Sequence, residues 1–379
     1  MREFDIVLYG ATGFTGRQCV KYFLRHAPPE LRWAIAGRSR VKLDQLQANV
    51  PAIVADGADP QAVDAMVRRT RIVLSTAGPF ELYSSAVVDA CVRFGSHYVD
   101  LSGETLWQRS LIERYHERAA AEGTRIIPAC GFESAVSDMG AVWMARRTGA
   151  IEVKAYFENE GGAPNGGTVA TGFHLARSYD ERFEDPFVLV PGAAREPRPL
   201  EIDPSAAQYD ADIGSWVTPF FFMGPINVRV VRRSCALLGL DFAYQEFSKA
   251  SGRAVAYAAS ARGAMLSRSL SSPFVRDTMQ RMAPGPGTGP SEETMENGWF
   301  RCDLFARAAD GRTSRAVVAG KGDPSNRVSV KCLCESALAL AGEEDALPAR
   351  GGLLTPASGI GEVLRERLQV RGITFEAAS

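Results

Sequence analysis

Short apolar runs alternate with amphipathic stretches over the first part of the chain. The runs are rich in Val, Ile, Leu and Ala, and we interpret them as buried strands at residues 6–9, 33–37, 51–56, 71–76, 97–101 and 124–130. Stretches with helical periodicity separate most of them. Because parallel strands of one sheet need a crossover connection, this alternation predicts an α/β fold built on a doubly wound parallel sheet.

The second part of the chain has a less regular pattern. The expected strands lie at residues 150–158, 299–307 and 315–321, and the expected helices at 172–182, 251–270 and 328–341. A proline-rich stretch at residues 186–203 is expected to be an irregular surface loop. Strands and helices that are grouped in this way indicate a second domain of the α+β class.

The first strand leads into a run of closely spaced glycines, and a helical stretch begins at Arg17. The run is Gly10-Ala11-Thr12-Gly13-Phe14-Thr15-Gly16. A strand, a tight glycine turn and a helix form the context that a dinucleotide-binding fingerprint requires. Glycine permits a sharp bend and the close approach of a pyrophosphate, which then faces the N–H groups of the helix terminus. All seven residues are candidate cofactor-binding residues, although a turn without a ligand would have the same pattern.

The end of the second strand indicates which dinucleotide is bound. Enzymes that select the unphosphorylated cofactor usually carry Asp or Glu there, to accept hydrogen bonds from the ribose 2′-hydroxyl. Here Gly37 is followed by Arg38 and Ser39, which suit a 2′-phosphate as a planar cation and a hydroxyl donor. We therefore predict NADPH, with solvated loop charges as the alternative.

Two further strand ends complete the predicted cofactor site. Asp56 ends the third strand, where it is expected near the adenine. The fourth strand ends in Thr76, Ala77, Gly78 and Pro79. Ligands of open α/β sheets collect at the carboxyl ends of central strands, and small residues there allow close approach to a ribose or nicotinamide.

Composition excludes several other classes of protein. The net charge of −1 gives no electrostatic footprint for nucleic acid, and no apolar run approaches the ~20 residues that span a bilayer. The seven cysteines are odd in number and scattered, as expected for reduced thiols in a cytoplasmic protein. The sequence has no Gly-x-Ser-x-Gly elbow and no metal-binding cluster, so we expect neither a hydrolase nor a bound metal.

Several of these motifs recur in one family in the same order. They are the glycine run, Ala36-Gly37-Arg38, Ala77-Gly78-Pro79-Phe80, Tyr98-Val99-Asp100-Leu101-Ser102-Gly103-Glu104 and Cys130-Gly131-Phe132. The chain resembles the saccharopine-dehydrogenase-like oxidoreductases, most closely the trans-acting enoyl reductases, over nearly its full length. The resemblance implies a Rossmann-type domain and an NADPH-dependent reductase that acts on a carbon–carbon or carbon–nitrogen double bond. Gly322-Asp323-Pro324-Ser325-Asn326 departs from the Gly-Asp-Pro-Gly-Tyr that is common in relatives.

The resemblance also implies a division of the chain. We expect a dinucleotide-binding domain at residues 1–149, a substrate and dimerisation domain at 150–342, and a C-terminal segment at 343–379 that returns to the first domain. The implied substrate is a small-molecule or carrier-bound acyl group of the lipid or polyketide type. A homodimer is possible. The alternatives are an imine or secondary-amine oxidoreductase and a non-catalytic nucleotide-binding protein that kept the fold.

Few side chains are candidates for the chemistry, because the cofactor carries the hydride. An enoyl reductase also needs a proton donor at the α-carbon. Tyr83 lies just beyond the Gly78-Pro79 turn and is the first candidate acid. Asp100 and Glu104 follow the fifth strand on the expected ligand side, where they could orient a donor or serve as structural caps.

The most lipophilic stretch runs from Trp216 to Val228 and contains Phe220, Phe221 and Phe222. Its prolines exclude a continuous helix, so we expect a strand with Phe220 and Phe222 on one face. One face could line an acyl-substrate pocket. The alternative is that both faces belong to the core or to a subunit interface.

Overall fold

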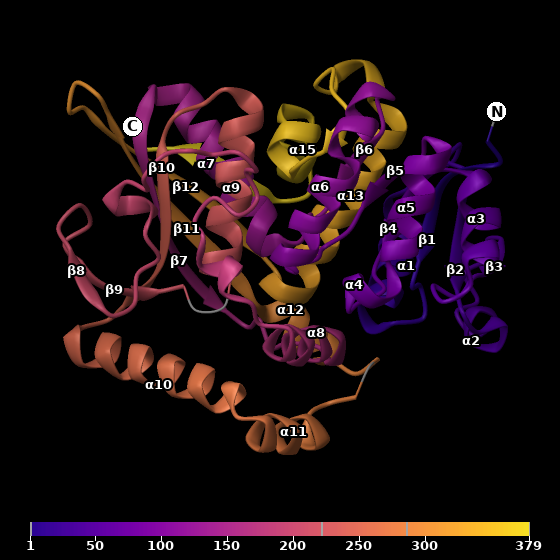
Figure 1. Ribbon diagram of the computed structural model, residues 1–379, viewed down its shortest axis with the longest axis horizontal. Coiled ribbons are helices and arrows are strands. Elements are labelled where there is room, and N and C mark those ends of the chain that lie inside the picture. The colour runs from indigo at the N-terminus through magenta and orange to yellow at the C-terminus, as the bar shows by residue number, and fades with distance from the viewer. Residues whose placement is uncertain (1, 221–222, 286, 379) are drawn as a thin grey trace.

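The computed structural model describes residues 2–220, 223–285 and 287–378. Its first sheet is wholly parallel, with the order β13-β6-β5-β4-β1-β2-β3. The strands are β1 (Phe4–Tyr9), β2 (Trp33–Gly37), β3 (Ala52–Val54), β4 (Thr70–Ser75), β5 (His97–Val99), β6 (Arg125–Ile127) and β13 (Gly352–Leu353). The predicted doubly wound sheet is confirmed (Figure 1).

Helices connect these strands and cover both faces of the sheet. They are α1 (Phe14–His26), α2 (Arg40–Asp44), α3 (Pro60–Arg68), α4 (Phe80–Tyr83), α5 (Ser85–Phe94), α6 (Thr105–Ala121) and α7 (Phe132–Thr148). The alternation of side chains along β1 separates two cores: Ile6 and Leu8 join the cluster that includes residues of α1, whereas Val7 packs with residues of α3 and α5. A strand buried on both faces needs the continuous apolar run that the sequence has.

The second sheet is mixed, with the order β14-β12-β11-β7-β10-β9-β8. Its strands are β7 (Ala150–Glu160), β8 (Gln208–Asp210), β9 (Ser215–Pro219), β10 (Ala243–Ala250), β11 (Trp299–Ala308), β12 (Thr313–Lys321) and β14 (Ile373–Ala377). Only the β7–β10 pair is parallel among the pairs described. Helices α7 and α9 (Gly224–Leu238) pack on each other and on this sheet, so α7 links the two sheets.

The remaining helices lie outside the regular alternation. They are α8 (Gly166–Arg177), α10 (Arg253–Ser271), α11 (Pro273–Met282), α12 (Glu292–Asn297), α13 (Ser329–Gly342), α14 (Pro356–Gly359) and α15 (Glu362–Val370). There are also 3-10 turns at Glu181–Glu184, Pro199–Glu201 and Glu344–Ala346, and a π-helical turn at Pro324–Val328. In the described ranges no helix has both the length and the apolar character needed to cross a membrane.

Segments from the later part of the chain join both sheets. Helix α13 lies within the predicted second domain, but it packs on α1 and β4 of the first sheet. The C-terminal residues divide between the sheets, since β13 pairs with β6 whereas β14 pairs with β12. Residues 343–379 therefore return only in part to the first sheet, and the exact domain limits stay a prediction.

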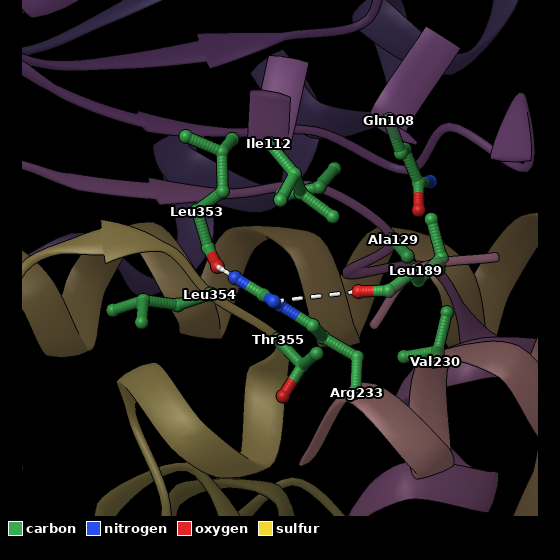
Figure 2. Close-up of a pocket in the computed structure, with 10 residues that line it drawn as sticks. Gln108, Ile112, Ala129, Leu189, Val230, Arg233, Leu353, Leu354 and Thr355 are labelled. Carbon is green, nitrogen blue, oxygen red and sulfur yellow. Dashed lines mark hydrogen bonds between the residues drawn. The ribbon is translucent and has the colours of Figure 1, made fainter. Parts of the chain in front are cut away.

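The long connection between α8 and β8 is held by arginines of α9 instead of by regular secondary structure. Arg229, Arg232 and Arg233 are buried and donate to carbonyl oxygens of Phe183, Pro186, Leu189 and Glu201. Figure 2 shows the Arg233 guanidinium at a small cavity, where it bonds the carbonyls of Leu189 and Leu353. Burial lowers the pKa of Arg233 to about 10. These cations satisfy backbone carbonyls that a buried irregular segment would otherwise leave unpaired.

Candidate functional site

The glycine turn lies between β1 and α1, at the carboxyl end of the central strand. Gly10 has a left-handed φ of +83°, and its N–H donates to the carbonyl of Ala36 over 3.0 Å. A Cβ at Gly16 would lie 2.2 Å from the Gly10 carbonyl oxygen, and one at Gly10 would lie 2.9 Å from the Ala77 nitrogen. The chain itself therefore requires glycine at positions 10 and 16.

Gly13 is different, because a Cβ at this position would meet only the Gly10 carbonyl oxygen, at 3.4 Å, within 4 Å. Its φ of −70° is open to any residue. Helix α1 starts directly after Gly13, and no side chain in the described chain caps its first N–H groups. Space beside an uncapped helix N-terminus suits a phosphate group. The predicted residues Ala11, Thr12, Phe14 and Thr15 surround this position.

Arg38, Ser39 and Asp56 lie at the ends of β2 and β3, on one side of the turn. Arg38 is exposed, and the Ser39 hydroxyl accepts the N–H of Lys42 at the start of α2. Burial and, to a smaller extent, the Asp56 charge raise the pKa of Tyr9 to about 12, against an opposing effect of the Arg38 charge. The charged groups of Arg38 and Asp56 therefore both lie near the Tyr9 hydroxyl. An exposed arginine in this region is free to meet a 2′-phosphate.

The other side of the turn is formed by the end of β4. The Thr76 hydroxyl donates to the Gly10 carbonyl over 3.1 Å, which ties β4 to the glycine turn. Ala77, Gly78 and Pro79 follow, and a Cβ at Gly78 would lie 3.2 Å from the Thr171 hydroxyl of α8. Helix α8 therefore approaches the carboxyl ends of the first sheet from the second part of the chain.

The carboxylate of Asp100 is committed to the protein. It accepts hydrogen bonds from the Tyr98 hydroxyl at 2.8 Å, the Ser102 N–H at 2.8 Å and the Ala129 N–H at 3.2 Å. The side chain is fully buried, and this burial raises its pKa to about 6. Asp100 fixes the strand ends of β5 and β6, and the same hydrogen bonds leave little capacity to orient a substrate.

The Glu104 carboxylate is likewise bound by backbone N–H groups, in this case those at the start of α4. Its two oxygens accept the N–H groups of Phe80 at 2.6 Å and Glu81 at 2.7 Å. Burial raises the pKa of Glu104 to about 7. The capping role that the sequence allowed for Glu104 accounts for its position.

Tyr83 ends α4 with its side chain 40% exposed. Its carbonyl oxygen would lie 2.6 Å from a Cβ at Gly57, the residue after Asp56. The backbone of Tyr83 therefore approaches the turn that follows β3. Its role as the acid stays a prediction.

Side chains from α4, from α8 and from the residue before α6 meet nearby. The Nε2 of His174 lies 2.8 Å from a Glu81 oxygen, and the ligand atoms of Glu81, Glu104 and His174 lie within 4.8 Å of one another. Both Glu104 oxygens already accept backbone N–H groups. We interpret the group as a polar contact that holds α8 against α4. Sequence spacing could not reveal it, because His174 is distant in the chain from both glutamates.

Glu133 was not among the predicted catalytic residues, yet it lies in the first turn of α7, directly after β6. It is half-buried and accepts one hydrogen bond, from the Ser325 hydroxyl over 3.2 Å. Burial raises its pKa, and the nearby Asp323 carboxylate adds to this effect. The signal in the sequence was its place at the carboxyl end of a central strand, the same rule that selected Asp100 and Glu104.

A chain of polar side chains connects the glycine turn with the turn that carries Ser325. The Nδ2 of Asn165 faces the Thr15 hydroxyl at 3.5 Å and donates to Asn326 at 3.1 Å. Asn326 in turn donates to Asp323 over 3.0 Å. The sequence departure at Ser325 and Asn326 is thus part of the contact between the two halves of the molecule.

The lipophilic stretch is a strand only up to Pro219, where β9 ends, and Gly224 begins α9. The expected core strand therefore covers only the first part of the stretch, because Pro225 occupies the first turn of a helix, where no N–H is required. Phe220 stacks on Phe157 of β7 with ring centroids 4.8 Å apart. Phe221 and Phe222 lie outside the described residues, so the predicted sharing of a face stays a prediction.

The sequence and fold are similar to those of known oxidoreductases. A family model described as the saccharopine dehydrogenase NADP binding domain matches residues 6–127. A trans-acting enoyl reductase of Mycobacterium ulcerans is 34% identical over 420 residues, covering 99% of this chain and 98% of that protein. Another, from Mycobacterium tuberculosis, is 34% identical over 413 residues, covering 99% and 97%.

Two solved structures share the fold over nearly the whole chain. Saccharopine dehydrogenase (L-Glu forming) from Saccharomyces cerevisiae has a TM-score of 0.54 at 13% identity, covering 99% of this chain and 100% of that chain. The homospermidine synthase of Legionella pneumophila, solved in complex with NAD, has a TM-score of 0.53 at 10% identity, covering 99% and 91%. The NADP binding domain confirms the cofactor class that Arg38 and Ser39 suggested.

Proposed function

The chain belongs to the trans-acting enoyl reductases, a branch of the saccharopine-dehydrogenase-like oxidoreductases, and from this membership we propose that it reduces the carbon–carbon double bond of an α,β-unsaturated acyl substrate with NADPH. The expected substrate is of the lipid or polyketide type, free or bound to a carrier. The single observation that supports dinucleotide chemistry best is the open position at Gly13, beside the N-terminus of α1.

The proposed cofactor site extends across the carboxyl ends of the first sheet. Arg38 and Ser39 would hold the 2′-phosphate, and Asp56 would lie near the adenine. The backbone from Gly10 to Gly16 would face the pyrophosphate. Thr76, Ala77, Gly78 and Pro79 would border the nicotinamide ribose. This direction follows the strand order, since the ends of β2 and β3 lie on one side of the glycine turn and those of β4, β5 and β6 on the other.

Glu133 is our proposed proton donor. Bound NADPH supplies a hydride to the β-carbon, so the chain needs to supply only a proton at the α-carbon. A carboxyl group whose pKa is raised by burial keeps that proton at higher pH than an exposed glutamate. Ser325 orients the carboxyl group through its hydrogen bond. After transfer the Glu133 carboxylate would regain its proton from water.

The earlier candidates have other roles in this proposal. Asp100 and Glu104 fix the ends of β5 and the start of α4, so they position the nicotinamide border instead of reacting. Tyr83 would lie beside the adenosine half of the cofactor. The proposed homodimer and the carrier-bound form of the substrate have no support in the contacts of the single chain.

The test is a set of rate measurements with purified protein, in which NADPH oxidation is followed with enoyl thioesters of graded chain length and with imines. We expect turnover with the enoyl thioesters and none with the matching saturated thioesters. Turnover with imines alone would favour the secondary-amine alternative. NADPH binding without turnover on either class would favour a non-catalytic protein. Gly13→Val protein is the control for oxidation that does not depend on the site.

A further inference from the structure

Helices α10 and α11 run end to end along one edge of the molecule (Figure 1). Helix α10 contacts β9, β10 and α8, and α11 contacts α8, but α11 has no buried residue. We call residues 253–282 the arm. We propose that the arm docks this protein on the surface of an anionic lipid bilayer. The proposal concerns binding and does not rest on the enoyl reductase activity.

The first observation is the exposure of large apolar side chains. Met282, Phe274 and Met265 are 83%, 81% and 73% exposed, and the nearest values elsewhere among the described large apolar residues are those of Val370, at 78%, and Val41, at 67%. Exposure of single apolar residues is normal, but a concentration of the most exposed ones in one short segment needs an explanation.

The second observation is the direction of Met265. In α10 the buried positions are Ala256 and Gly263, which face the protein body. Met265 is nine residues after Ala256, and at about 100° per residue it lies on the opposite side of the helix. The outer face of α10 also carries exposed alanines at positions 254, 258 and 261. An apolar face directed away from the protein body is typical of a helix that lies in a membrane interface.

The third observation is charge. The arm contains the arginines 253, 262, 268, 276 and 281 and a single acidic residue, Asp277, so its net charge is +4 (five minus one) whereas that of the whole chain is −1. Asp277 is paired with Arg177 at 2.9 Å. Among the described residues, Arg262, Arg268 and Arg281 have no carboxylate partner.

Exposed apolar side chains with unpaired arginines on the same segment fit the surface of a bilayer better than a groove of a protein. The apolar groups would enter the acyl boundary, and the long arginine side chains would reach the headgroups. Each basic residue near an anionic surface adds attraction that falls off within a Debye length. Binding should therefore need anionic lipid and should weaken with salt.

The arm leads directly to the glycine turn. Arg17 of α1 donates to the Gly287 carbonyl over 2.8 Å, and the Gly166 N–H donates to the Thr288 carbonyl over 2.9 Å. A Cβ at Gly289 would lie 2.4 Å from the ring of Phe14. A surface-bound arm would hold this end of the molecule, with its cofactor turn, close to the lipid.

The test is sedimentation of the full chain with vesicles. We expect binding to vesicles of phosphatidylcholine with phosphatidylglycerol, and at least about ten-fold weaker partitioning to phosphatidylcholine alone. The double variant Phe274→Ser with Met282→Ser, and the triple variant Arg262→Gln, Arg268→Gln and Arg281→Gln, should each lose about ten-fold in partitioning. Val370→Ser is the matched control, since Val370 is equally exposed on α15. Circular dichroism checks that each variant is folded.

Several outcomes would overturn the proposal. They are no binding to anionic vesicles, an equal loss in the Val370→Ser control, and full binding in both arm variants. A dimer in light scattering that the Phe274→Ser and Met282→Ser changes abolish would assign the arm to a second copy of the chain. Capture of an acidic acyl carrier protein without vesicle binding would assign it to that partner instead.

Discussion

The Ser325 hydroxyl donates a hydrogen bond over 3.2 Å to an oxygen of Glu133, although 192 residues separate the two in the chain. Glu133 belongs to the β6–α7 junction of the first sheet, and Ser325 to the π-helical turn after β12. The proposed proton donor is therefore fixed by the half of the molecule that we expect to meet the substrate.

Glu133→Gln tests this assignment. We expect turnover to fall by roughly 10²–10⁴-fold, the usual contribution of a general acid, while the NADPH dissociation constant stays the same. In the unchanged enzyme the protonated carboxyl is the active form, so kcat/KM should fall as pH rises through its raised pKa. Steady-state rates across a pH series measure both effects, and the variant should lack this alkaline decline.

Ser325→Ala is the companion variant. It removes one hydrogen bond to the Glu133 carboxylate, which should shift the alkaline limb to higher pH because the ionised form loses a donor. An unchanged pH profile in both variants would remove Glu133 from the acid role. His174→Gln would then be the next variant to assay, since His174 also lies near the Gly78 turn.

Gly13 and Gly16 should respond differently to substitution. Gly13→Val should fold normally and lose NADPH binding, because the added side chain fills the space beside the N-terminus of α1. Gly16→Ala should instead lower the free energy of unfolding by about 1–3 kcal/mol, since its Cβ would overlap the Gly10 carbonyl. Calorimetric titration with NADPH and denaturant unfolding separate the two effects. Undiminished NADPH affinity in folded Gly13→Val would contradict the turn assignment.

Arg38 should be responsible for a higher binding affinity for NADPH than for NADH. Arg38→Ala is expected to weaken NADPH binding by about 1.5–3 kcal/mol, the scale for a charge-assisted hydrogen bond. Binding of NADH, which has no 2′-phosphate, should change much less. Fluorescence titrations with both cofactors measure the difference, and Arg40→Ala, an exposed arginine already paired with Asp44, is the control. Equal losses for NADPH and NADH would exclude this role for Arg38.

Much of the first domain could be predicted from the sequence because its signals are local. A strand such as β1 is buried on both faces, so its residues form a continuous apolar run, and the glycine turn follows it directly. The same rule, ligands at the carboxyl ends of strands, selected Asp100 and Glu104 as candidates. It could not tell that backbone N–H groups from Ser102, Ala129 and Phe80 already occupy their oxygens.

The second part of the chain was harder to predict because its structure depends on distant partners. Helix α9 buries three arginines, which a helical pattern of apolar residues does not anticipate, and they are stable there because the irregular segment before β8 presents carbonyls to them. The Ser325–Glu133 contact likewise joins positions that no local pattern relates. Pro225 excluded a helix through the whole lipophilic stretch, but the pattern did not show that α9 begins beside it.

A buried network lies behind Glu133 and makes stability depend on pH. Glu246 of β10 is fully buried and accepts hydrogen bonds from Ser137 at 2.7 Å, Asn227 at 2.6 Å and Tyr244 at 2.9 Å. Burial, with a smaller effect of the nearby Glu133 charge, raises the pKa of Glu246 to about 8. The folded protein therefore holds a proton on Glu246 that the unfolded chain releases near its ordinary pKa of about 4.5.

Glu246→Gln should remove this dependence. In the unchanged protein, Glu246 binds its proton more tightly in the folded state than in the unfolded state. The resulting contribution to the free energy of unfolding is fully present below about pH 4.5 and is lost as pH rises toward about 8. The free energy of unfolding should fall by roughly 3–5 kcal/mol over this range from Glu246 alone. Glutamine cannot ionise, and its amide can still form hydrogen bonds with Ser137 and Asn227. The decline of the free energy of unfolding from about pH 5 to 8, measured by urea unfolding, should therefore be shallower in the variant.

Asp100→Asn is the matched control. The pKa of Asp100 is raised only to about 6, so its effect on the free energy of unfolding should not extend above about pH 6. If the decline is as steep in Glu246→Gln as in the unchanged protein, Glu246 is ionised in the folded state and its three donors, not a bound proton, balance its burial.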